Sequence, residues 1–203
     1  MQIVLLTPET EMPHETGIVN SLFAAGLQRL HLRRYGATEA QIIQYISAIH
    51  PQFHPRIVVH SHYHLLHDLH LYGIHLNTAT RLSPAVSAMT SGIPAEKTST
   101  SFHSWLEVID NTVPYRYVFI SPVFNSISKP GYLAGIDRTQ LPAIRAQQKA
   151  SGSAPAIYAL GGIDHSNIIT LKNDGFDGAA LLGSIWQAQD PVRALTNILE
   201  LLK

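Results

Sequence analysis

The sequence contains no cysteine, which excludes disulfide bonds and any metal site built from thiolates. It also lacks an excess of either charge, because 14 lysines and arginines balance 14 aspartates and glutamates. A protein without net charge has no general attraction for nucleic acids or anionic membranes, so we expect neither as a partner. Long hydrophobic runs are missing, and the N-terminus has no basic segment followed by a long apolar one. We therefore expect a soluble, cytoplasmic protein.

The chain alternates short β-branched runs with longer amphipathic segments. We expect strands at residues 2–6, 30–33, 56–60, 73–76, 97–100, 115–120, 156–160 and 178–182. We expect helices at residues 16–27, 38–49, 83–89, 103–109, 138–149, 166–173 and 191–202, with one more helix after the third strand. Thr38, with Gln41 three residues later, is expected to cap the second helix, and Ser101 is expected to cap the helix that begins at residue 103.

Eight strand and helix pairs follow one another without a linker or a change in composition. This pattern predicts an α/β fold, a single-domain (β/α)8 TIM barrel spanning residues 1–203. A doubly wound open sheet is the alternative, but its usual Gly-x-Gly-x-x-Gly fingerprint is replaced after the first strand by Thr7-Pro8-Glu9-Thr10. In a barrel the active site lies at the carboxyl ends of the strands, so the residues that follow each strand are the functional candidates.

A polar loop follows the expected strand at residues 115–120, which is apolar enough to be buried on both faces. The loop carries Ser126, Ser128 and Lys129. Lysine supplies a positive charge and serine supplies a hydroxyl donor, so this loop is a candidate anion site. The alternative is an ordinary polar loop at the surface.

Glycines end the last two expected strands, in Leu160-Gly161-Gly162-Ile163 and Leu182-Gly183-Ser184-Ile185. In barrels these two loops commonly bind phosphate through backbone N–H groups, because glycine lets the main chain approach the phosphate oxygens closely. The two glycine-bearing ends on adjacent strands therefore predict a phosphate site. Tight turns that bind no ligand are the alternative.

Several segments together resemble the thiamine phosphate synthase/TenI family, in the same order and spacing along nearly the whole chain. The segments are Leu30-His31-Leu32-Arg33, Ser101-Phe102-His103-Ser104, Ser121-Pro122-Val123-Phe124 with the polar loop, Ala159-Leu160-Gly161-Gly162-Ile163, and Gly175-Phe176-Asp177-Gly178. The resemblance implies a small phosphorylated heterocycle as substrate. It also implies that Gly162, Leu182 and Gly183 hold a thiazole phosphate. Ser126, Ser128 and Lys129 stand where the family has Thr, Thr and Lys, and the serines keep the hydroxyl groups.

The chain departs from this family where its synthases hold magnesium and pyrophosphate. His60-Ser61 stands in place of Asn-Asp, Asn77-Thr78-Ala79-Thr80 stands where an acid is usual, and Tyr35 replaces a lysine. Serine and alanine cannot replace a carboxylate as a ligand of Mg²⁺. We therefore expect no cofactor and no metal site, with Mg²⁺ required only if the chain is a synthase.

His103 is the candidate catalytic residue. The resemblance to the TenI branch implies that this histidine shifts a proton in a metal-free tautomerisation that aromatises a thiazole carboxylate phosphate. Imidazole suits that task because its ordinary pKa lies near neutrality. The alternative is that His103 only opens the helix that follows it.

His31 and Arg33 are two residues apart on one strand, so we expect both side chains to face the barrel mouth as substrate-binding groups. Arg33 has the alternative of a structural ion pair. The histidine-rich stretch from residue 60 to residue 75 invites a metal interpretation, but we interpret most of it as an exposed helix that partly packs on the core. His60 and His75, at strand ends, are candidates to line the site.

Three functions follow from these residues. A thiazole tautomerase in thiamine biosynthesis is favoured, because the phosphate-binding positions are better kept than the metal-binding positions. A thiamine phosphate synthase that condenses hydroxymethylpyrimidine pyrophosphate with thiazole phosphate is the first alternative. A non-catalytic protein that binds a phosphorylated ligand is the second. The family resemblance further implies a homodimer.

Overall fold

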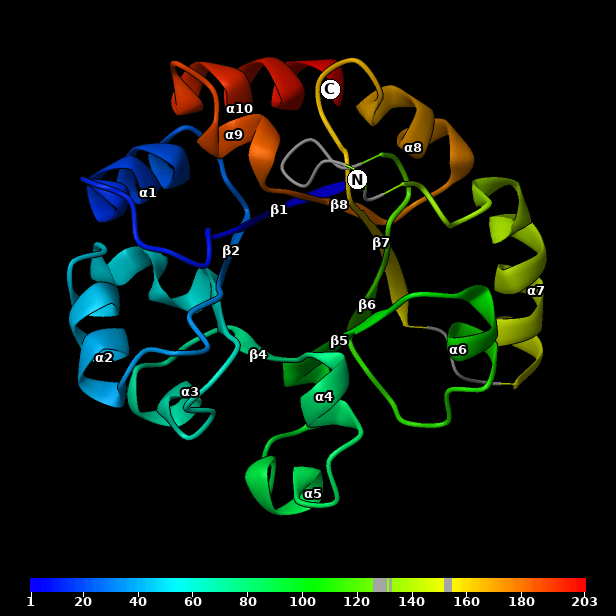
Figure 1. Cartoon of the computed structure of the whole chain (residues 1–203), viewed down its shortest axis with the longest axis horizontal. Helices are drawn as coiled ribbons and strands as arrows, with labels where there is room; N and C mark the ends of the chain where they lie inside the picture. The colour runs from blue at the N-terminus through cyan, green and yellow to red at the C-terminus, as the bar shows by residue number, and fades with distance from the viewer. Residues whose placement is uncertain (126–130, 132, 152–154) are drawn as a thin grey trace.

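Eight parallel strands form a closed barrel in the computed structural model, which describes residues 1–125, 131, 133–151 and 155–203 (Figure 1). Each strand pairs with the next along the chain, and the last pairs with the first. The strands are β1 (Gln2–Leu6), β2 (Arg29–Leu32), β3 (Ile57–Val59), β4 (Gly73–Leu76), β5 (Thr98–Phe102), β6 (Tyr117–Ile120), β7 (Ala156–Leu160) and β8 (Gly178–Leu181). The predicted TIM barrel is confirmed, and the strand positions are right to within a few residues.

Helices surround the barrel in a ring (Figure 1). They are α1 (Glu15–Ala24), α2 (Glu39–Ser47), α3 (Leu65–Asp68), α4 (Thr78–Arg81), α5 (Val86–Met89), α6 (Trp105–Ile109), α7 (Leu141–Ser151), α8 (Ile168–Asp174), α9 (Gly183–Trp186) and α10 (Pro191–Leu201). Short 3-10 helices occupy Pro51–Arg56, Ala95–Lys97 and Arg138–Gln140. In the described part of the chain, no helix is long and apolar enough to cross a membrane.

Two helix starts test the predicted caps. Thr38 caps α2 in a complete capping box with Gln41, as predicted. The predicted cap at Ser101 is wrong, because Ser101 belongs to β5 and the side chain of Ser104 accepts the capping hydrogen bond from the N–H of Glu107. His103 therefore precedes α6 and lies at the carboxyl end of β5.

The fourth unit has two short helices instead of the single helix predicted at residues 83–89. α4 begins directly after β4 because the Asn77 side chain accepts a hydrogen bond from the N–H of Thr80 and caps it. Pro84 lies between the two helices, and the residue before a proline is disfavoured in helical conformation, so the chain cannot run through as one helix.

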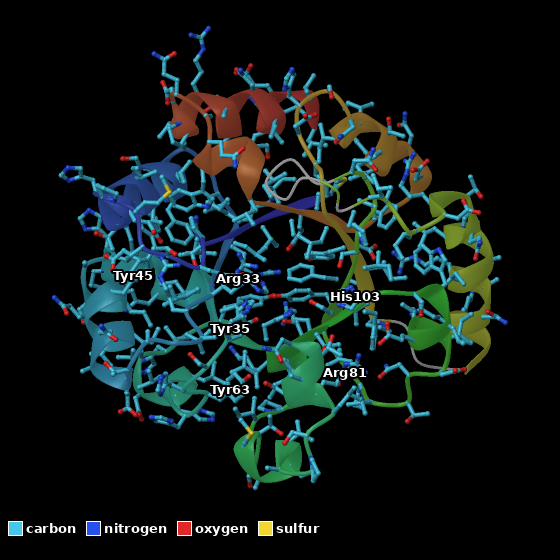
Figure 2. The ribbon with its side chains drawn as sticks, in the orientation of Figure 1. Arg33, Tyr35, Tyr45, Tyr63, Arg81 and His103 are labelled. Atoms are coloured by element: carbon cyan, nitrogen blue, oxygen red, sulfur yellow. The ribbon has the colours of Figure 1, made fainter. Side chains whose placement is uncertain are left out.

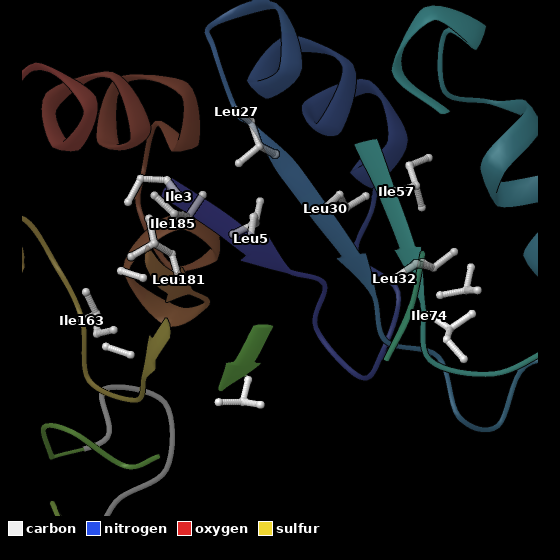
Figure 3. Close-up of a cluster of buried hydrophobic side chains, with 14 of the residues drawn as sticks. Ile3, Leu5, Leu27, Leu30, Leu32, Ile57, Ile74, Ile163, Leu181 and Ile185 are labelled. Atoms are coloured by element: carbon white, nitrogen blue, oxygen red, sulfur yellow. The ribbon is translucent and has the colours of Figure 1, made fainter. Parts of the chain in front are cut away.

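Two apolar layers follow from the alternation of side chains along each strand. The outer layer packs strands against helices, as Ile3, Leu5 and Leu30 show in Figure 3. The inner layer fills part of the barrel and consists of Val4, Leu6, Tyr117, Phe119, Tyr158 and Ala180. These inner residues come from β1 and β6 to β8, so the opposite half of the barrel, formed by β2 to β5, is filled by other side chains.

Candidate active site

Arg33 lines a cavity of about 340 Å³ that also includes Leu182, Gly183 and Glu9. These residues follow β2, β8 and β1, so the cavity lies at the carboxyl end of the barrel, where TIM barrels carry their active sites. The Arg33 side chain is largely buried and forms one ion pair, at 3.4 Å, with the exposed Glu9. Its Nε is buried and has no hydrogen-bond partner among the described residues. The guanidinium thus retains donor capacity toward an anion in this cavity.

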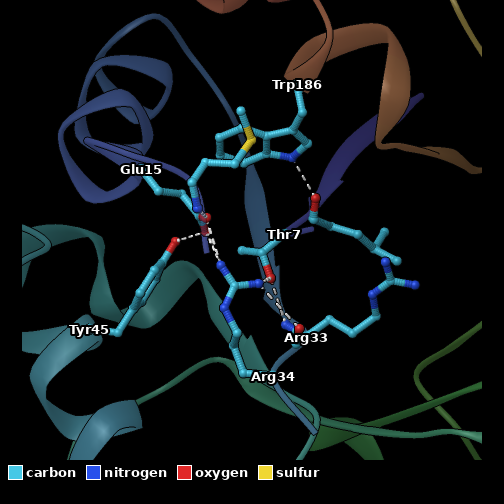
Figure 4. Close-up of polar contacts among 8 residues, drawn as sticks. Thr7, Glu15, Arg33, Arg34, Tyr45 and Trp186 are labelled. Carbon is cyan, nitrogen blue, oxygen red and sulfur yellow. Dashed lines mark hydrogen bonds and ion pairs between the residues drawn. The ribbon is translucent and has the colours of Figure 1, made fainter. Parts of the chain in front are cut away.

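The neighbouring Arg34 has a structural role instead (Figure 4). Its guanidinium donates to both oxygens of the fully buried Glu15 carboxylate at 2.6 Å, and Tyr45 Oη donates to the same carboxylate at 2.7 Å. Burial, together with the charge of Glu15, raises the pKa of Tyr45 and keeps its hydroxyl protonated. The pair was not predicted from the sequence, where a structural ion pair was an alternative for Arg33 only. The pair fixes the chain immediately after Arg33 and so orients the end of β2.

His103 stands exposed at the carboxyl end of β5, and Figure 2 shows it on the other side of the barrel opening from Arg33 and Tyr35. Its Nδ1 lies 3.2 Å from Ser121 Oγ and 3.3 Å from the Ser121 carbonyl oxygen. Its backbone N–H donates to the Glu107 carboxylate at 2.6 Å. Within the described residues, Nε2 has no hydrogen-bond partner, so the ring is oriented through one nitrogen while the other is open to a ligand.

Gly162 and Gly183 follow β7 and β8, which are paired neighbours in the barrel. Gly183 begins α9 and lines the Arg33 cavity. Gly162 has a positive φ of 65°, and a Cβ at this position would lie 2.2 Å from the Asn125 carbonyl oxygen. Glycine at 162 is therefore required for the close approach of two loops. Ser126, Ser128 and Lys129 lie outside the described residues.

Three buried histidines meet inside the barrel. His31 Nδ1 lies 2.9 Å from His60 Nε2, and the His60 and His75 rings stack with centroids 4.5 Å apart. Burial, followed by the influence of neighbouring histidines, holds the pKa of His31 well below its ordinary value, and burial likewise lowers the pKa of His60. Burial lowers the pKa of His75 to about 3. All three imidazoles are therefore neutral at physiological pH.

Comparison with known proteins identifies the family. The family model for thiamine monophosphate synthase, which includes TenI, matches residues 3–185. The chain belongs to this family. A thiamine-phosphate synthase of Chlamydia caviae is 23% identical over 99% of this chain and 94% of its own length. A thiamine phosphate pyrophosphorylase of Bacteroides thetaiotaomicron has 29% identity and a TM-score of 0.76, covering 100% of this chain and 98% of that one.

A thiamine phosphate pyrophosphorylase of Pyrococcus furiosus has a TM-score of 0.78 at 16% identity, covering 99% of this chain and 95% of that one, and supports the fold alone. The resemblance read from the sequence is thereby confirmed. This member of the thiamine monophosphate synthase family is an enzyme of thiamine biosynthesis with a TIM-barrel fold.

Synthases of this family use Mg²⁺, and the resemblance implies that its ligands follow β3 and β4. After β3 stand the buried imidazole of His60 and the hydroxyl of Ser61, and after β4 the Asn77 side-chain oxygen is already engaged by the N–H of Thr80 at 2.8 Å. Magnesium takes oxygen ligands in octahedral geometry, usually with a carboxylate. These two strand ends do not fit a magnesium ion.

The histidine-rich stretch divides into two groups. His64, His67 and His70 are exposed around α3, whose Leu65 and Leu66 are buried, as the predicted partly packed helix requires. His60 lines a cavity with Tyr35, and His75 is buried on β4. Both rings contact the ring of His31. His31 lies inside the barrel with no exposed surface, whereas Arg33 lies at the cavity, so the two do not share one environment.

Proposed function

We propose that this enzyme is a transferase of the thiamine phosphate synthase kind, which joins a hydroxymethylpyrimidine pyrophosphate to a thiazole phosphate. The proposal rests on the full-length similarity to proteins named thiamine-phosphate synthase and thiamine phosphate pyrophosphorylase. Those names favour the synthase over the tautomerase, which was the function first expected from the sequence. The observation that carries it in the structure is the shared cavity of Arg33, Leu182 and Gly183.

In this reaction the thiazole nitrogen forms a C–N bond to the pyrimidine methylene carbon. The C–O bond to pyrophosphate breaks, and its electron pair leaves with the pyrophosphate. Both substrates are anionic, so a cation at the cavity wall lowers the cost of bringing them together and of developing charge on the leaving group. Arg33 supplies that cation, and its unpaired Nε–H supplies a further donor. Backbone N–H groups at the start of α9 are suited to the thiazole phosphate.

The test is formation of thiamine phosphate from the two substrates, with Mg²⁺, Mn²⁺ and Co²⁺ supplied in turn. We expect product with the unmodified chain and a loss of kcat/KM of roughly 100-fold in Arg33→Ala, because one electrostatic contact to the transition state is removed. Arg193→Ala is the matched control, since Arg193 is an exposed arginine on α10 that does not line the cavity. If no metal yields product with the unmodified chain, the transferase assignment has to be abandoned.

A tautomerase is the second candidate, because the His103 ring is held at Nδ1 and open at Nε2. That arrangement suits a group that takes a proton from one ring atom of the substrate and returns it to another. His103→Ala should then abolish conversion of the non-aromatic thiazole carboxylate phosphate. Undiminished turnover in this variant would remove His103 from the mechanism.

A thermal-shift measurement separates both enzymes from a protein that only binds its ligand. We expect thiazole phosphate to raise the melting temperature without added metal, because a ligand bound only by the folded chain stabilises it. Stabilisation without turnover in either assay would select the non-catalytic alternative. A melting temperature that does not change with thiazole phosphate would contradict a thiazole-phosphate site of any kind.

A further inference from the structure

One half of the barrel interior is lined by imidazoles and hydroxyls. Barrel interiors are usually filled by branched apolar side chains, whereas β1 and β6 to β8 fill theirs with aliphatic and aromatic ones. On β2 to β5 the inward side chains include His31, His75, Ser99 and Ser101, with His60 directly after β3. The buried Arg29 and Val58 complete this half of the interior, and the Arg29 guanidinium lies over the Tyr117 ring. Burying polar groups costs free energy that apolar side chains would avoid. The arrangement therefore calls for a ligand that apolar residues cannot bind.

The three histidines present nitrogen atoms at the spacing of metal ligands. One ring nitrogen from each of His31, His60 and His75 lies within 4.8 Å of the other two. Zinc bonded to nitrogen at 2.0–2.1 Å in a tetrahedron places its ligand atoms about 3.4 Å apart. His31 Nδ1 and His60 Nε2 are 2.9 Å apart. Ring movements on the order of 1 Å would therefore let one nitrogen of each histidine bind the same ion.

The ring nitrogens that face away from this point are each held by a hydroxyl. His31 Nε2 lies 2.6 Å from Tyr117 Oη, and His60 Nδ1 lies 3.1 Å from Tyr35 Oη. His75 Nδ1 lies 2.9 Å from Ser99 Oγ. Histidines that bind metals almost always donate their second N–H to a fixed partner, which sets the tautomer and the ring orientation. All three rings have such a partner.

The tautomer of His75 follows from its two serines. Ser99 Oγ donates to the Ile74 carbonyl oxygen at 3.1 Å, so it accepts from the Nδ1–H of His75. The lone pair of His75 is then on Nε2, where Ser101 Oγ lies at 3.0 Å. Ser101 donates to that lone pair, so its hydroxyl must turn away when an ion binds. One proton lies in the hydrogen bond between His31 and His60. Its move to the outer nitrogen of the ring that carries it, with the facing tyrosine hydroxyl turning to accept it, frees the other two lone pairs.

We propose that His31, His60 and His75 bind one divalent transition-metal ion of the zinc class inside the barrel. A cavity of about 380 Å³ lined by His60 and Tyr35 adjoins the three histidines and gives the ion a route in. Three imidazoles with one open position form a donor set that suits zinc, cobalt or nickel, and that a hard cation such as Mg²⁺ does not prefer. The site differs in its donor atoms from a magnesium site, and it does not depend on the reaction proposed above.

The test uses Co²⁺ alone as the probe and the full chain stripped of metal with a chelator. We expect equilibrium dialysis to retain one Co²⁺ per chain, with the strong visible absorption of a tetrahedral site. In His60→Gln the affinity should fall at least about 100-fold and the absorption should vanish. The control variant carries His64→Gln, His67→Gln and His70→Gln together, and because these side chains are exposed it should bind like the unmodified chain.

Tyr117→Phe tests the outer hydrogen bond without emptying the core, and it serves even if His60→Gln fails to fold. Tyr117 is a positioning residue here, so we expect Co²⁺ binding about 10–100-fold weaker with a changed absorption spectrum. Retention of less than one Co²⁺ by the unmodified chain would overturn the proposal. So would loss of Co²⁺ from the control variant, or binding by Tyr117→Phe with unchanged affinity and spectrum.

Discussion

Two adjacent arginines at the end of β2 have opposite roles because their carboxylate partners are buried to different degrees. Glu15, the partner of Arg34, has no exposed side-chain surface, whereas 62% of the Glu9 side chain, the partner of Arg33, is exposed. Removing the partner of a buried charge lowers the free energy of unfolding far more than removing the partner of an exposed charge, because water cannot replace the buried partner. The Arg34 pair is therefore the one on which folding depends.

Glu15→Gln should lower the free energy of unfolding by about 3–5 kcal/mol, because it leaves the Arg34 charge buried without a counter-charge. Glu9→Gln is the matched control and should change it by less than about 1 kcal/mol. Urea denaturation followed by circular dichroism measures both. Equal effects of the two substitutions would show that burial does not distinguish the pairs.

The sequence identified several site residues but not how they meet. Arg33 was predicted as the last residue of a strand and Gly183 as the residue after one, and a shared barrel end is enough to bring them to one cavity. His31, His60 and His75 were each named, but their convergence depends on the register of β2, β3 and β4, which no local pattern encodes. The Arg34 and Glu15 pair was missed because its members are 19 residues apart and belong to different elements.

At the scale of the elements, Gly73 at the start of β4 lies against Lys97, the last residue of the 3-10 helix before β5. A Cβ at this position would lie 2.3 Å from the Lys97 carbonyl oxygen, a backbone atom that cannot rotate away. Gly73→Ala should therefore destabilise the chain by about 1–3 kcal/mol or more, because the two strands must separate. Gly17→Ala on α1 is the matched control with the opposite sign, since nothing lies within 4 Å and alanine favours a helix by about 0.5–1 kcal/mol. Thermal unfolding of the two variants compares them, and a stable Gly73→Ala would contradict the close approach.

The start of α6 should contribute stability that depends on pH. Burial favours neutral Glu107, but the N–H of His103 and the guanidinium of Arg81 outweigh it, so the pKa of Glu107 lies below its ordinary value of 4.5. A lowered pKa means that the folded chain gains stability above that value and loses it as the pH falls further. Glu107→Gln should therefore destabilise the protein at neutral pH and flatten the stability curve below pH 4.5. Parallel curves for the variant and the unmodified chain would show that Glu107 has no such role.

Element types were predictable from the sequence because they depend on local patterns. The β-branched runs fix the strands, and the capping box of Thr38 fixes the start of α2. The start of α6 was placed wrongly because Ser101 and Ser104 both suit a cap, and only the length of β5 decides between them. α4 was missed although Asn77 suits a helix cap, and α5 begins three residues later than predicted.

At the scale of the whole molecule, the barrel is closed by contacts between the two ends of the chain. β1 pairs with β8, and the indole N–H of Trp186 donates to the Leu6 carbonyl oxygen at 2.7 Å (Figure 4). This hydrogen bond joins α9 to the end of β1 across 180 residues of sequence. A closed ring in which each strand depends on both neighbours is expected to unfold as one cooperative unit.

Trp186→Phe tests that expectation, because it leaves the buried Leu6 carbonyl without its donor and should cost about 1–3 kcal/mol. The chain has two tryptophans, so the variant retains Trp105 on α6 as its single tryptophan probe. Since unfolding is cooperative, Trp105 fluorescence and circular dichroism should shift together to lower denaturant concentration. If Trp105 fluorescence and circular dichroism changed at different denaturant concentrations, parts of the barrel would be unfolding separately. The hydrogen bond of Trp186 would then stabilise only the part of the barrel around β1 and α9.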